Sequence, residues 1–520
     1  MKDLTSSVYN FEKLRQNDYL YVDKTEYIWK LIHPAGESYF LSRPRRFGKS
    51  LILSTLKAVF EGKKELFKGL AIYDKPYDWK PYPVLHLDLN GWNFSGIGEL
   101  KRSLTGLMQE CAEDHHVVLT ATEPDGMFRQ IIRALAVQGP VVLLLDEYDK
   151  PILNNIGQPE VPQILAYLKS FYSVIKAFEG ELRFAFITGV SKFSHVSLFS
   201  DLNNLTDITM DARFAAMLGY TQEELEANFS DRLEALAGNQ DIEEVKKEIK
   251  AWYNGYRFHP NAPTVYNPVS LAKFFESGGE FNNYWFSTGT PSFLMELIKR
   301  RHFDFEKVLH EPVSQIAFEA YEVENLEPLT LLLQTGYMTI KSSIRQFGQT
   351  WYYLDFPNRE VAGAFSAYIL KSYTQKDRVG VVQFTAEIAR SLLAGDLVKL
   401  RKIMEVFFAG IPYNVHKKNE ATFQAIFFAL FRLLGEFIEA ESCTNDGRID
   451  AVVQTSEAIY LFEFKMDNDP TALEQIKTKE YFQKFLLDPR KIHLIGVNFD
   501  SEKGNLIGWQ NAVLQGNVLQ

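Results

Sequence analysis

The chain has 520 residues, of which 46% are hydrophobic and 23% are charged, and its formal net charge is −10. At ~100–200 residues per domain, this length predicts two to four domains with large cores. The negative charge excludes a protein coated uniformly with basic residues for nucleic acid, although residues 1–70 hold 13 Lys and Arg against 8 Asp and Glu and so leave room for a local basic groove.

Membrane insertion and disulfide cross-linking are not expected. The sequence has no run of about 18 apolar residues without a charge, and its N-terminus lacks the apolar core of a secretory signal. Cys111 and Cys443 are too few and too far apart for a disulfide framework or a zinc cluster, so we expect both to be buried or inert. These features predict a cytoplasmic protein.

The first segment of chemical interest is Ser42–Leu51, which reads SRPRRFGKSL. It follows the apolar residues Tyr39–Leu41 and precedes Leu51–Phe60, a run with helical spacing. This order of strand, loop and helix is the setting of the nucleotide-binding pattern GxxxxGK[ST]. In that pattern backbone N–H groups bind phosphate oxygens, the lysine reaches the outer phosphates, and the hydroxyl group holds Mg²⁺.

The end of the pattern is satisfied by Gly48, Lys49 and Ser50. Arg43 stands where the first glycine is expected, and Arg45 and Arg46 follow it inside the loop. The sequence therefore predicts an ATP site with an irregular start, and it leaves open whether these arginines assist phosphate binding or touch DNA.

The next chemical feature is Val141–Glu147, VVLLLDE, after Gly139 and Pro140. Apolar residues followed by two carboxylates are typical of a central strand in a parallel sheet, whose C-terminal end is where such sheets bind ligands. We expect Asp146 to hold Mg²⁺ through water and Glu147 to orient or deprotonate the attacking water. The alternative is a buried strand with a solvated acidic turn, but the GKS triplet upstream favours a nucleotide site.

Leu182–Ser191 reads as another apolar strand with a polar end. Thr188 or Ser191 is predicted to contact the γ-phosphate or the water, and Lys192 to add a positive charge. The alternative, which the sequence does not exclude, is that these residues only close the turn after the strand.

From about residue 221 the pattern becomes helical. Thr221 and Glu224 predict a capping box at the start of a helix. The aromatic segments WYNGYRF and VYNPVSLAKFF suit either a packed core or a groove that stacks bases, and helical spacing favours the core. Residues 325–356 predict a small subdomain of strands and short helices.

The last ~110 residues read as a compact α/β domain. A helix over Asn419–Phe437, with Glu420 in its first turn, precedes a strand at Glu436–Ser442 and a hairpin formed by Ile449–Gln454 and Ala458–Lys465. Asp469 and Pro470 are predicted to start a further helix that runs to about residue 486, and Lys491–Phe499 to close the domain with a strand.

An acid and a base share one face of the third strand of this domain. Glu463 and Lys465 are two residues apart, and Asp450 begins the adjoining strand. We expect Asp450 and Glu463 to bind Mg²⁺, Lys465 to position water or stabilise the transition state, and Glu420 to complete the metal shell. The alternative is a salt-bridged polar face, but the spacing of GRID, 12 residues and EFK favours a metal site.

Together, RPRRFGKSL, LLDEYDKP, LNNLTDIT, WYNGYRF, FSTGTPSFL, GRID and EFK resemble motifs of bacterial proteins that couple an AAA-ATPase-like domain to a C-terminal PD-(D/E)XK nuclease-superfamily domain. The resemblance covers nearly the whole chain. It implies an α/β protein with a P-loop NTPase-like αβα domain (1–220), a helical and mixed middle region (221–411) and a restriction-endonuclease-like α/β domain (412–520).

The resemblance also implies roles for single residues. Arg43 is then a usual residue of the loop, and Ile449 replaces the proline of the superfamily name without removing a ligand. The positions that match the family pattern are Lys49 and Ser50 in the loop, Asp146 and Glu147 at the acidic strand end, Asp450, Glu463, Lys465 and Glu420 in the nuclease core, and Gln475 and Tyr481 in the helix after it.

The leading functional hypothesis is an ATP-binding, Mg²⁺-dependent nuclease in which the nucleotide state gates access of nucleic acid to the C-terminal site. A second is a nucleotide-regulated binding or scaffold protein whose nuclease fold does not cut, because residues 412–520 hold 11 Lys and Arg against 15 Asp and Glu. A third is an oligomeric ATPase switch in which a neighbouring subunit supplies an arginine, for which Arg213 is one choice.

Overall fold

The computed structural model describes residues 2–33, 37–192, 199, 204–285, 292–301, 303–318, 327–374, 377–411, 420–435, 439–442, 449–467, 472–500, 506–515 and 518–519. The chain forms two compact units. The first comprises Met1–Thr288, Ser314–Thr350 and Asp355–Asn358, and the second comprises Gly289–Val313, Trp351–Leu354 and Arg359–Gln520. Among the helices of the described ranges, none combines the length and the apolar composition that a membrane span requires.

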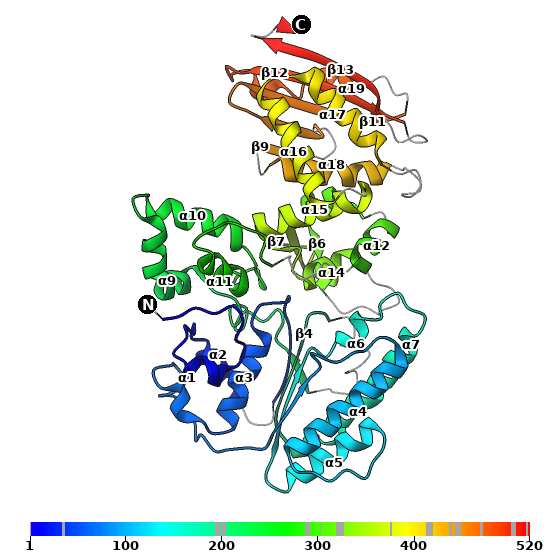
Figure 1. Ribbon diagram of the computed structural model, residues 1–520. Coiled ribbons are helices and arrows are strands. Elements are labelled where there is room, and N and C mark those ends of the chain that lie inside the picture. The colour runs from blue at the N-terminus through cyan, green and yellow to red at the C-terminus, as the bar shows by residue number, and fades with distance from the viewer. Residues whose placement is uncertain are drawn as a thin grey trace. The chain divides into compact units, whose positions relative to one another are not determined.

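A sheet of five parallel strands, in the order β2-β3-β4-β1-β5, is the centre of the first unit. Its strands are β1 (Ser38–Ser42), β2 (Val84–Asp88), β3 (Val141–Asp146), β4 (Leu182–Gly189) and β5 (Leu205–Asp207). Every residue of β1 and β3 is buried, as expected for strands that are covered on both faces. Figure 1 shows α3 on one side of the sheet and α4, α5 and α7 on the other, which confirms the αβα layers.

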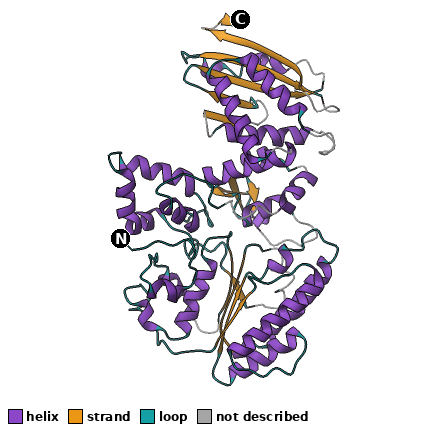
Figure 2. Ribbon diagram, viewed as in Figure 1, coloured by secondary structure: helices purple, strands orange, loops and turns teal. Residues whose placement is uncertain are grey.

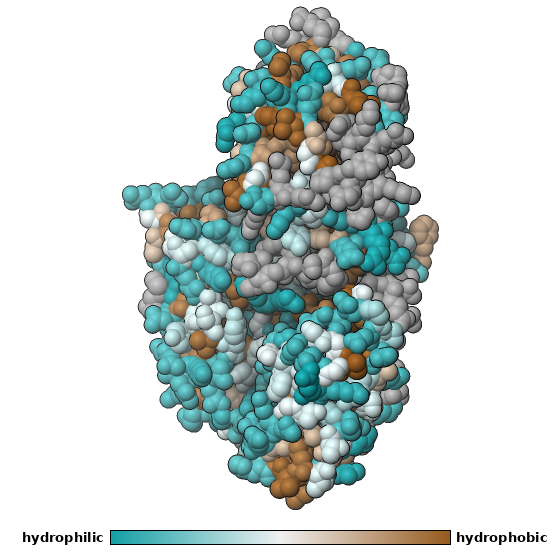
Figure 3. All heavy atoms as spheres, turned by 45° about the vertical axis from the view of Figure 1, so that its right-hand side comes forward, coloured by the Kyte–Doolittle hydropathy of each residue, from teal (hydrophilic) through white to brown (hydrophobic). Residues whose placement is uncertain are grey.

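The helices around this sheet are α1 (Phe11–Gln16), α2 (Thr25–Ile32), α3 (Lys49–Phe60), α4 (Gly96–Asp114), α5 (Pro124–Ala136), α6 (Lys150–Leu153) and α7 (Val161–Ala177). Each of the longer ones buries one apolar face, and α4 buries Cys111 with it. Cys443 lies outside the described residues. On the face shown in Figure 3, hydrophilic residues cover most of this unit, because most of its apolar side chains are buried in the core.

A bundle of three helices follows, formed by α9 (Gln222–Ala237), α10 (Ile242–Tyr253) and α11 (Pro268–Glu276). The capping box predicted for Thr221 and Glu224 is present at the start of α9. The aromatic segments supply the core of the bundle, which contains Phe229, Tyr253 and Phe274. They therefore serve packing rather than an open base-stacking groove, as the helical spacing indicated.

The chain then passes through short elements, which are α12 (Ser292–Arg300), α13 (Phe305–His310), β6 (Val313–Ser314), α14 (Pro328–Gln334), β7 (Thr339–Gln346) and β8 (Gln349–Asp355). The three strands form a small sheet in the order β6-β8-β7. The strands β7 and β8 and the short helix α14 lie within residues 325–356, where the sequence predicted strands and short helices. Three longer helices continue the chain, α15 (Arg359–Thr374), α16 (Arg378–Leu393) and α17 (Leu397–Ala409).

The C-terminal part of the second unit contains a mixed sheet of six strands in the order β14-β13-β12-β11-β10-β9. Its elements are α18 (Glu420–Leu434), β9 (Glu439–Ser442), β10 (Ala451–Gln454), β11 (Ala458–Met466), α19 (Ala472–Thr478), β12 (Lys491–Phe499), β13 (Leu506–Gln515) and β14 (Val518–Leu519). The predicted hairpin of β10 and β11 is present, and β12 pairs with β11 in parallel. Figure 2 shows these strands in orange, with helices packed against them.

The two faces of β11 pack against different helices. Phe464 stacks on Phe427 of α18, with ring centroids 3.8 Å apart, whereas Leu461 shares a core with Ile476 of α19. Because side chains alternate along a strand, Glu463 and Lys465 lie on the α19 face.

Two expectations for this domain were wrong. The predicted start at Asp469 and Pro470 lies outside the described residues, and the helix predicted to run to about residue 486 ends at Thr478, since Glu480 adopts a left-handed backbone conformation with φ of 49° that interrupts a helix. A short turn of 3-10 helix at Gln483–Phe485 replaces its second half. Lys491–Phe499 also does not close the domain, because β13 and β14 extend the sheet beyond it.

Candidate functional site

The phosphate-loop pattern lies between β1 and α3, as predicted. Gly48 precedes the first residue of α3 with φ of 95°, a left-handed conformation that glycine adopts without strain. Lys49 is buried, and its Nζ donates to the carbonyl oxygens of Arg43 at 3.0 Å and Pro44 at 3.1 Å. The loop therefore wraps around its own lysine and holds a positive charge at the helix N-terminus.

Ser50 and Asp146 meet although they are far apart in the sequence. The Ser50 hydroxyl donates to Asp146 Oδ2 at 2.6 Å, and the Glu147 N–H donates to Asp146 Oδ1 at 3.0 Å. Burial raises the pKa of Asp146 to about 6, and the Ser50 hydrogen bond opposes this shift. Asp88, which is level with Asp146 on β2, raises the pKa further through its negative charge.

This pair fits a magnesium–nucleotide complex. Within the described ranges no three His, Cys, Asp or Glu side chains gather into a group able to hold a metal ion. Magnesium does not need such a cage, since it is usually held by one or two protein oxygens together with substrate phosphates and waters. A hydroxyl and a carboxylate 2.6 Å apart, beside a buried lysine, supply that set.

Glu147 lies at the same edge of the sheet. Its backbone adopts φ of 53°, which is uncommon for a residue with a side chain, and so turns the chain sharply after β3. The carboxylate remains partly exposed and lies 3.8 Å from the Lys150 ammonium. Glu147 is therefore near Asp146 and accessible to water, which the predicted role in orienting water requires.

The polar end of β4 is occupied by contacts within the protein. β4 lies between β1 and β3, so Thr188 is in the expected place, but its hydroxyl donates to the Leu41 carbonyl oxygen at 2.8 Å. The Ser191 hydroxyl donates to Asp149 at 2.5 Å, and the Lys192 ammonium pairs with Asp207 at 2.6 Å. Ser191 and Lys192 thus have contacts that fix the turn after the strand and Thr188 links β4 to β1, while the predicted contact of Thr188 or Ser191 with phosphate or water stays a prediction.

The three arginines of the loop have different environments. Arg43 is 1% exposed, donates to the carbonyl oxygens of Thr209 at 2.7 Å and Ser42 at 2.9 Å, and lies 4.0 Å above the ring of Phe258. Burial lowers the pKa of Arg43 to about 9. Arg46 donates to the Tyr284 carbonyl oxygen at 2.8 Å, and Arg45 is exposed. Arg43 therefore anchors the loop to later parts of the unit, and Arg45 is the one whose side chain is exposed to solvent.

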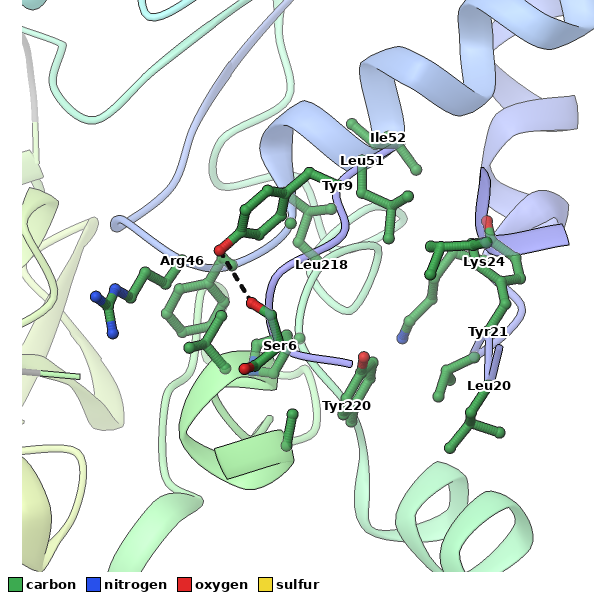
Figure 4. Close-up of a pocket in the computed structure, with 18 of the residues that line it drawn as sticks. Ser6, Tyr9, Leu20, Tyr21, Lys24, Arg46, Leu51, Ile52, Leu218 and Tyr220 are labelled. Carbon is green, nitrogen blue, oxygen red and sulfur yellow. Dashed lines mark hydrogen bonds between the residues drawn. The ribbon is translucent and has the colours of Figure 1, made fainter. Parts of the chain in front are cut away.

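A cavity adjoins the other side of the loop (Figure 4). Its walls come from the N-terminal segment, from the loop and α3, and from the chain just before α9. The principal lining residues are Tyr9, Tyr21, Lys24, Gly48, Leu51, Ile52, Leu218 and Tyr220. The Lys24 ammonium is held by Glu224 at 2.6 Å and by the Ala216 carbonyl oxygen at 2.8 Å. The cavity is thus mostly apolar and begins where the phosphate loop ends.

The second candidate site surrounds the end of β11. Glu463 is 1% exposed, and the Lys465 ammonium lies 3.8 Å from Glu463 Oε1. Burial, and then the negative charge of Asp450, raise the pKa of Glu463 well above its ordinary value, which Lys465 partly offsets. Glu463 and Lys465, which the sequence predicted on one strand face, therefore lie close together. Their buried environment disfavours a negative charge that has no positive partner.

Asp450 and Gln475 complete this arrangement. Asp450 Oδ2 accepts from the Phe464 N–H at 2.7 Å, so its carboxyl group is fixed against β11 beside Glu463. The Gln475 amide donates to Glu463 Oε1 and lies 3.4 Å from the Tyr481 hydroxyl. Glu463 Oε2 is buried without a hydrogen-bond partner among the described residues. A buried carboxylate oxygen with no donor fits a hard cation such as Mg²⁺.

Glu420 is the first residue of α18, and its side chain lies outside the described part of the chain. α18 itself packs on the Phe464 face of β11, opposite the face of Glu463. The place of Glu420 in a metal shell stays a prediction.

Comparison with known proteins identifies both regions. Residues 6–199 match the family model described as predicted AAA-ATPase, and residues 418–509 match that of the PD-(D/E)XK nuclease superfamily. A protein of Azotobacter chroococcum mcd 1, described as an uncharacterized protein in the vnfD 5′ region, is 38% identical over 522 residues and aligns with 98% of each chain. The chain belongs to this family of predicted AAA-ATPases with a PD-(D/E)XK nuclease-superfamily domain.

The matched ranges contain both candidate sites of this predicted AAA-ATPase. The loop and the acidic end of β3 lie in the first range, and Asp450, Glu463 and Lys465 lie in the second. The resemblance inferred from the motifs and the expected fold class are confirmed. The domain limits 1–220, 221–411 and 412–520 and the roles of the site residues stay predictions.

Sequence patterns did not single out two acidic residues of the AAA-ATPase-like region, Asp88 and Asp149. Asp88 ends β2 level with Asp146, and the short strand VLHLD that ends in an acid was the available signal. Asp149 is fully buried and accepts from the N–H groups of Val190 at 3.0 Å and Ser191 at 2.7 Å. It ties the turn after β3 to the end of β4, a contact with no local sequence signal.

Proposed function

We propose that this protein is an ATP-hydrolysing, Mg²⁺-dependent nuclease in which the nucleotide bound by the first unit controls the C-terminal site. The observation that carries the proposal is the buried Glu463 carboxylate, whose Oε2 has no donor among the described residues, beside Asp450 and Lys465. Leaving such a group unpaired is costly, and a bound cation would satisfy it.

The nuclease chemistry follows from the three side chains. Bound Mg²⁺ would supply positive charge at the scissile phosphate and a more acidic water. Asp450 and Glu463 would hold the ion with carboxylate oxygens. The Lys465 ammonium, 3.8 Å from Glu463, is placed to stabilise the charge that develops as a water oxygen bonds to phosphorus and the bond to the sugar oxygen breaks. Gln475, which donates to Glu463, would keep that carboxylate oriented.

The nucleotide site is supported by the contacts of Lys49, Ser50 and Asp146. The Lys49 ammonium has two loop carbonyl oxygens as acceptors, which a nucleotide phosphate would replace with stronger, charged ones. Ser50 and Asp146 would hold the magnesium ion, and Glu147 would orient water. The apolar cavity beside Gly48 adjoins the loop, and the nucleoside would lie there with its phosphates on the loop.

Coupling of this site to the rest of the first unit is supported by aromatic contacts. The Phe47 ring, within the loop, meets Tyr256 edge-on at 4.8 Å and Phe258 at 5.4 Å between centroids. Arg43 lies over the same Phe258. We propose that a rearrangement of the loop on phosphate binding is transmitted through these rings to the helical bundle, and so to the control of the nuclease site.

The test is a cleavage assay on single-stranded, duplex and branched DNA and RNA, with Mg²⁺ or Mn²⁺ and with or without ATP. Asp450→Ala and Lys465→Ala should abolish cleavage and leave ATP binding unchanged, whereas Lys49→Ala should abolish ATP binding. Cleavage by the Asp450 and Lys465 variants at the wild-type rate would remove the proposal.

A second candidate function is a nucleotide-regulated binding protein that does not cut. It is favoured by the negative balance of residues 412–520, with 11 Lys and Arg against 15 Asp and Glu. Binding that persists in EDTA, with no cleavage under any metal condition, would establish it. For the oligomeric switch, Arg213 is exposed and pairs with its neighbour Asp211 at 2.6 Å, and a single sedimenting species of monomer mass with and without ATP would exclude a ring.

A further inference from the structure

The segment from the end of α19 to the start of β12 carries an excess of positive charge, whereas the rest of the nuclease domain carries an excess of negative charge. Residues 477–491 hold five of the 11 Lys and Arg of residues 412–520 but only two of the 15 Asp and Glu. In a domain of net negative charge, phosphate groups are attracted to such a local excess. The segment therefore repels a polyanion less than the remainder of residues 412–520, which holds six Lys and Arg against 13 Asp and Glu.

Three of these cations, Lys479, Lys484 and Lys491, are exposed and form no ion pair with any described residue. Lys479 and Lys484 lie on the stretch that directly follows α19, and Lys484 lies 4.8 Å from the Phe485 ring. Arg490, by contrast, is held by Asp488 at 2.6 Å, and Lys477 is 3.4 Å from Glu474.

The segment is fixed beside the candidate nuclease site. Tyr481 lies between the two lysines in sequence, and its hydroxyl is 3.4 Å from the Gln475 amide that donates to Glu463. Tyr481, Phe482 and Phe485 pack against the apolar core on the same face of the sheet. The lysines are thus carried by a packed segment that starts at the site.

The segment also exposes two adjacent leucines. Leu486 is 38% exposed and Leu487 is 101% exposed. A single exposed leucine is ordinary, but here the pair follows Lys484 and Phe485 on a segment that begins at the site. Apolar side chains beside cations suit a strand that offers both phosphates and the apolar faces of unstacked bases. In a continuous duplex those faces are stacked inside.

We propose that residues 479–487 form the arm with which the nuclease domain binds its substrate, and that this substrate is nucleic acid with unpaired bases. Lys479 and Lys484 contact phosphates next to the cleavage site, and Leu486 and Leu487 contact base faces. This inference rests on the proposed nuclease function and adds the substrate class to it.

The experiment measures binding separately from cleavage. Fluorescence anisotropy with the full chain in EDTA follows a labelled single strand, a forked duplex and a continuous duplex over a series of salt concentrations. The variants are the double substitution Lys479→Gln with Lys484→Gln, and Leu487→Ser. The control is Lys399→Gln with Lys402→Gln, which removes the same charge from exposed positions of α17. That helix packs through Phe408 on the opposite, Phe464 side of the sheet.

Loss of two phosphate contacts should flatten the slope of log affinity against log salt by about 1.4 and weaken single-strand binding about 25-fold at 0.1 M salt. Leu487→Ser should lower the preference for the single strand over the duplex several-fold, without a change in slope. The control pair should bind as the wild type does, and all variants should share its melting temperature.

Several results would contradict the proposal that residues 479–487 bind the substrate. One is unchanged binding by the arm variants, and another is an equal loss in the control pair. A third is a wild-type preference for continuous duplex. Tighter binding of a polyglutamate peptide than of any nucleic acid, lost in the same variants, would point to an acidic protein partner instead. If the wild type binds nucleic acid but does not cleave it, the proposed binding arm stands and the proposed nuclease function is wrong. If the arm variants cleave as fast as the wild type, the nuclease function stands and the proposed arm is wrong.

Discussion

Replacing Arg43 by glycine would restore the first residue of the GxxxxGK[ST] pattern, yet we expect the change to destabilise the first unit. The guanidinium group is buried, donates to carbonyl oxygens of Thr209 and Ser42 at 2.7 and 2.9 Å, and lies 4.0 Å from the Phe258 ring. Because the guanidinium group is 1% exposed and donates its hydrogen bonds within the protein, this position stabilises the fold through its partners rather than through exposure of its charge to phosphate.

The magnitude follows from what the substitution leaves behind. A buried carbonyl that loses its donor costs about 1–3 kcal/mol, and the space left beside Phe258 adds a cavity penalty of similar size. A total loss of about 3–5 kcal/mol corresponds to a fall in melting temperature of roughly 4–7 °C for a unit of this size. ATP affinity should fall as well, because the loop loses its anchor.

Thermal unfolding and ATP titration of Arg43→Gly test this expectation. Arg45→Gly is the matched control, since Arg45 is exposed in the same loop and should change the melting temperature little. A melting temperature for Arg43→Gly equal to the wild-type value, with ATP bound at least as tightly, would refute the reasoning and return Arg43 to the role of an irregular phosphate-loop residue.

Three further predictions concern the carboxylates and their partners. Ser50→Ala should weaken Mg²⁺-dependent ATP binding about tenfold or more and leave metal-free binding nearly unchanged, because it removes one oxygen ligand; calorimetry with and without EDTA measures both. Burial raises the pKa of Asp146 to about 6, so protonation should weaken Mg²⁺–ATP binding as the pH falls through that value, and a flat profile would contradict it. The raised pKa of Glu463 means that its ionised form destabilises the metal-free fold, so wild-type stability in EDTA should decline as the pH rises from the ordinary glutamate value through the raised one. Glu463→Gln should abolish that decline and melt above the wild type at alkaline pH, and identical melting profiles would show that Glu463 is not desolvated.

Much of both candidate sites was accessible from the sequence because their residues sit in short motifs. Lys49 and Ser50 follow a strand and open a helix, and Glu463 and Lys465 alternate on one strand, so local periodicity alone places them. The meeting of Ser50 with Asp146 could be inferred because the C-terminal ends of parallel strands share one edge of a sheet.

The remaining features depend on contacts that periodicity does not encode. Arg43 is anchored by Thr209 and Phe258, which are distant in sequence, so its structural role was invisible beside a phosphate-binding motif. Thr188 was placed at the correct edge, but its hydroxyl bonds to a neighbouring strand. The helix predicted after Asp469 ended early because Glu480 takes a left-handed conformation that helical propensity alone does not predict.

The most direct test of the central claim is metal-dependent cleavage by wild type and Lys465→Ala, with Lys402→Ala as an exposed control on α17. A substrate set of single-stranded, forked and continuous duplex DNA, with Mg²⁺ and with or without ATP, covers the alternatives. The structure predicts cleavage by the wild type and the control, a rate that changes when ATP is added, and no cleavage by Lys465→Ala, with ATP bound equally by all three. Cleavage by Lys465→Ala at the wild-type rate, or none by the wild type under any condition, would contradict the account.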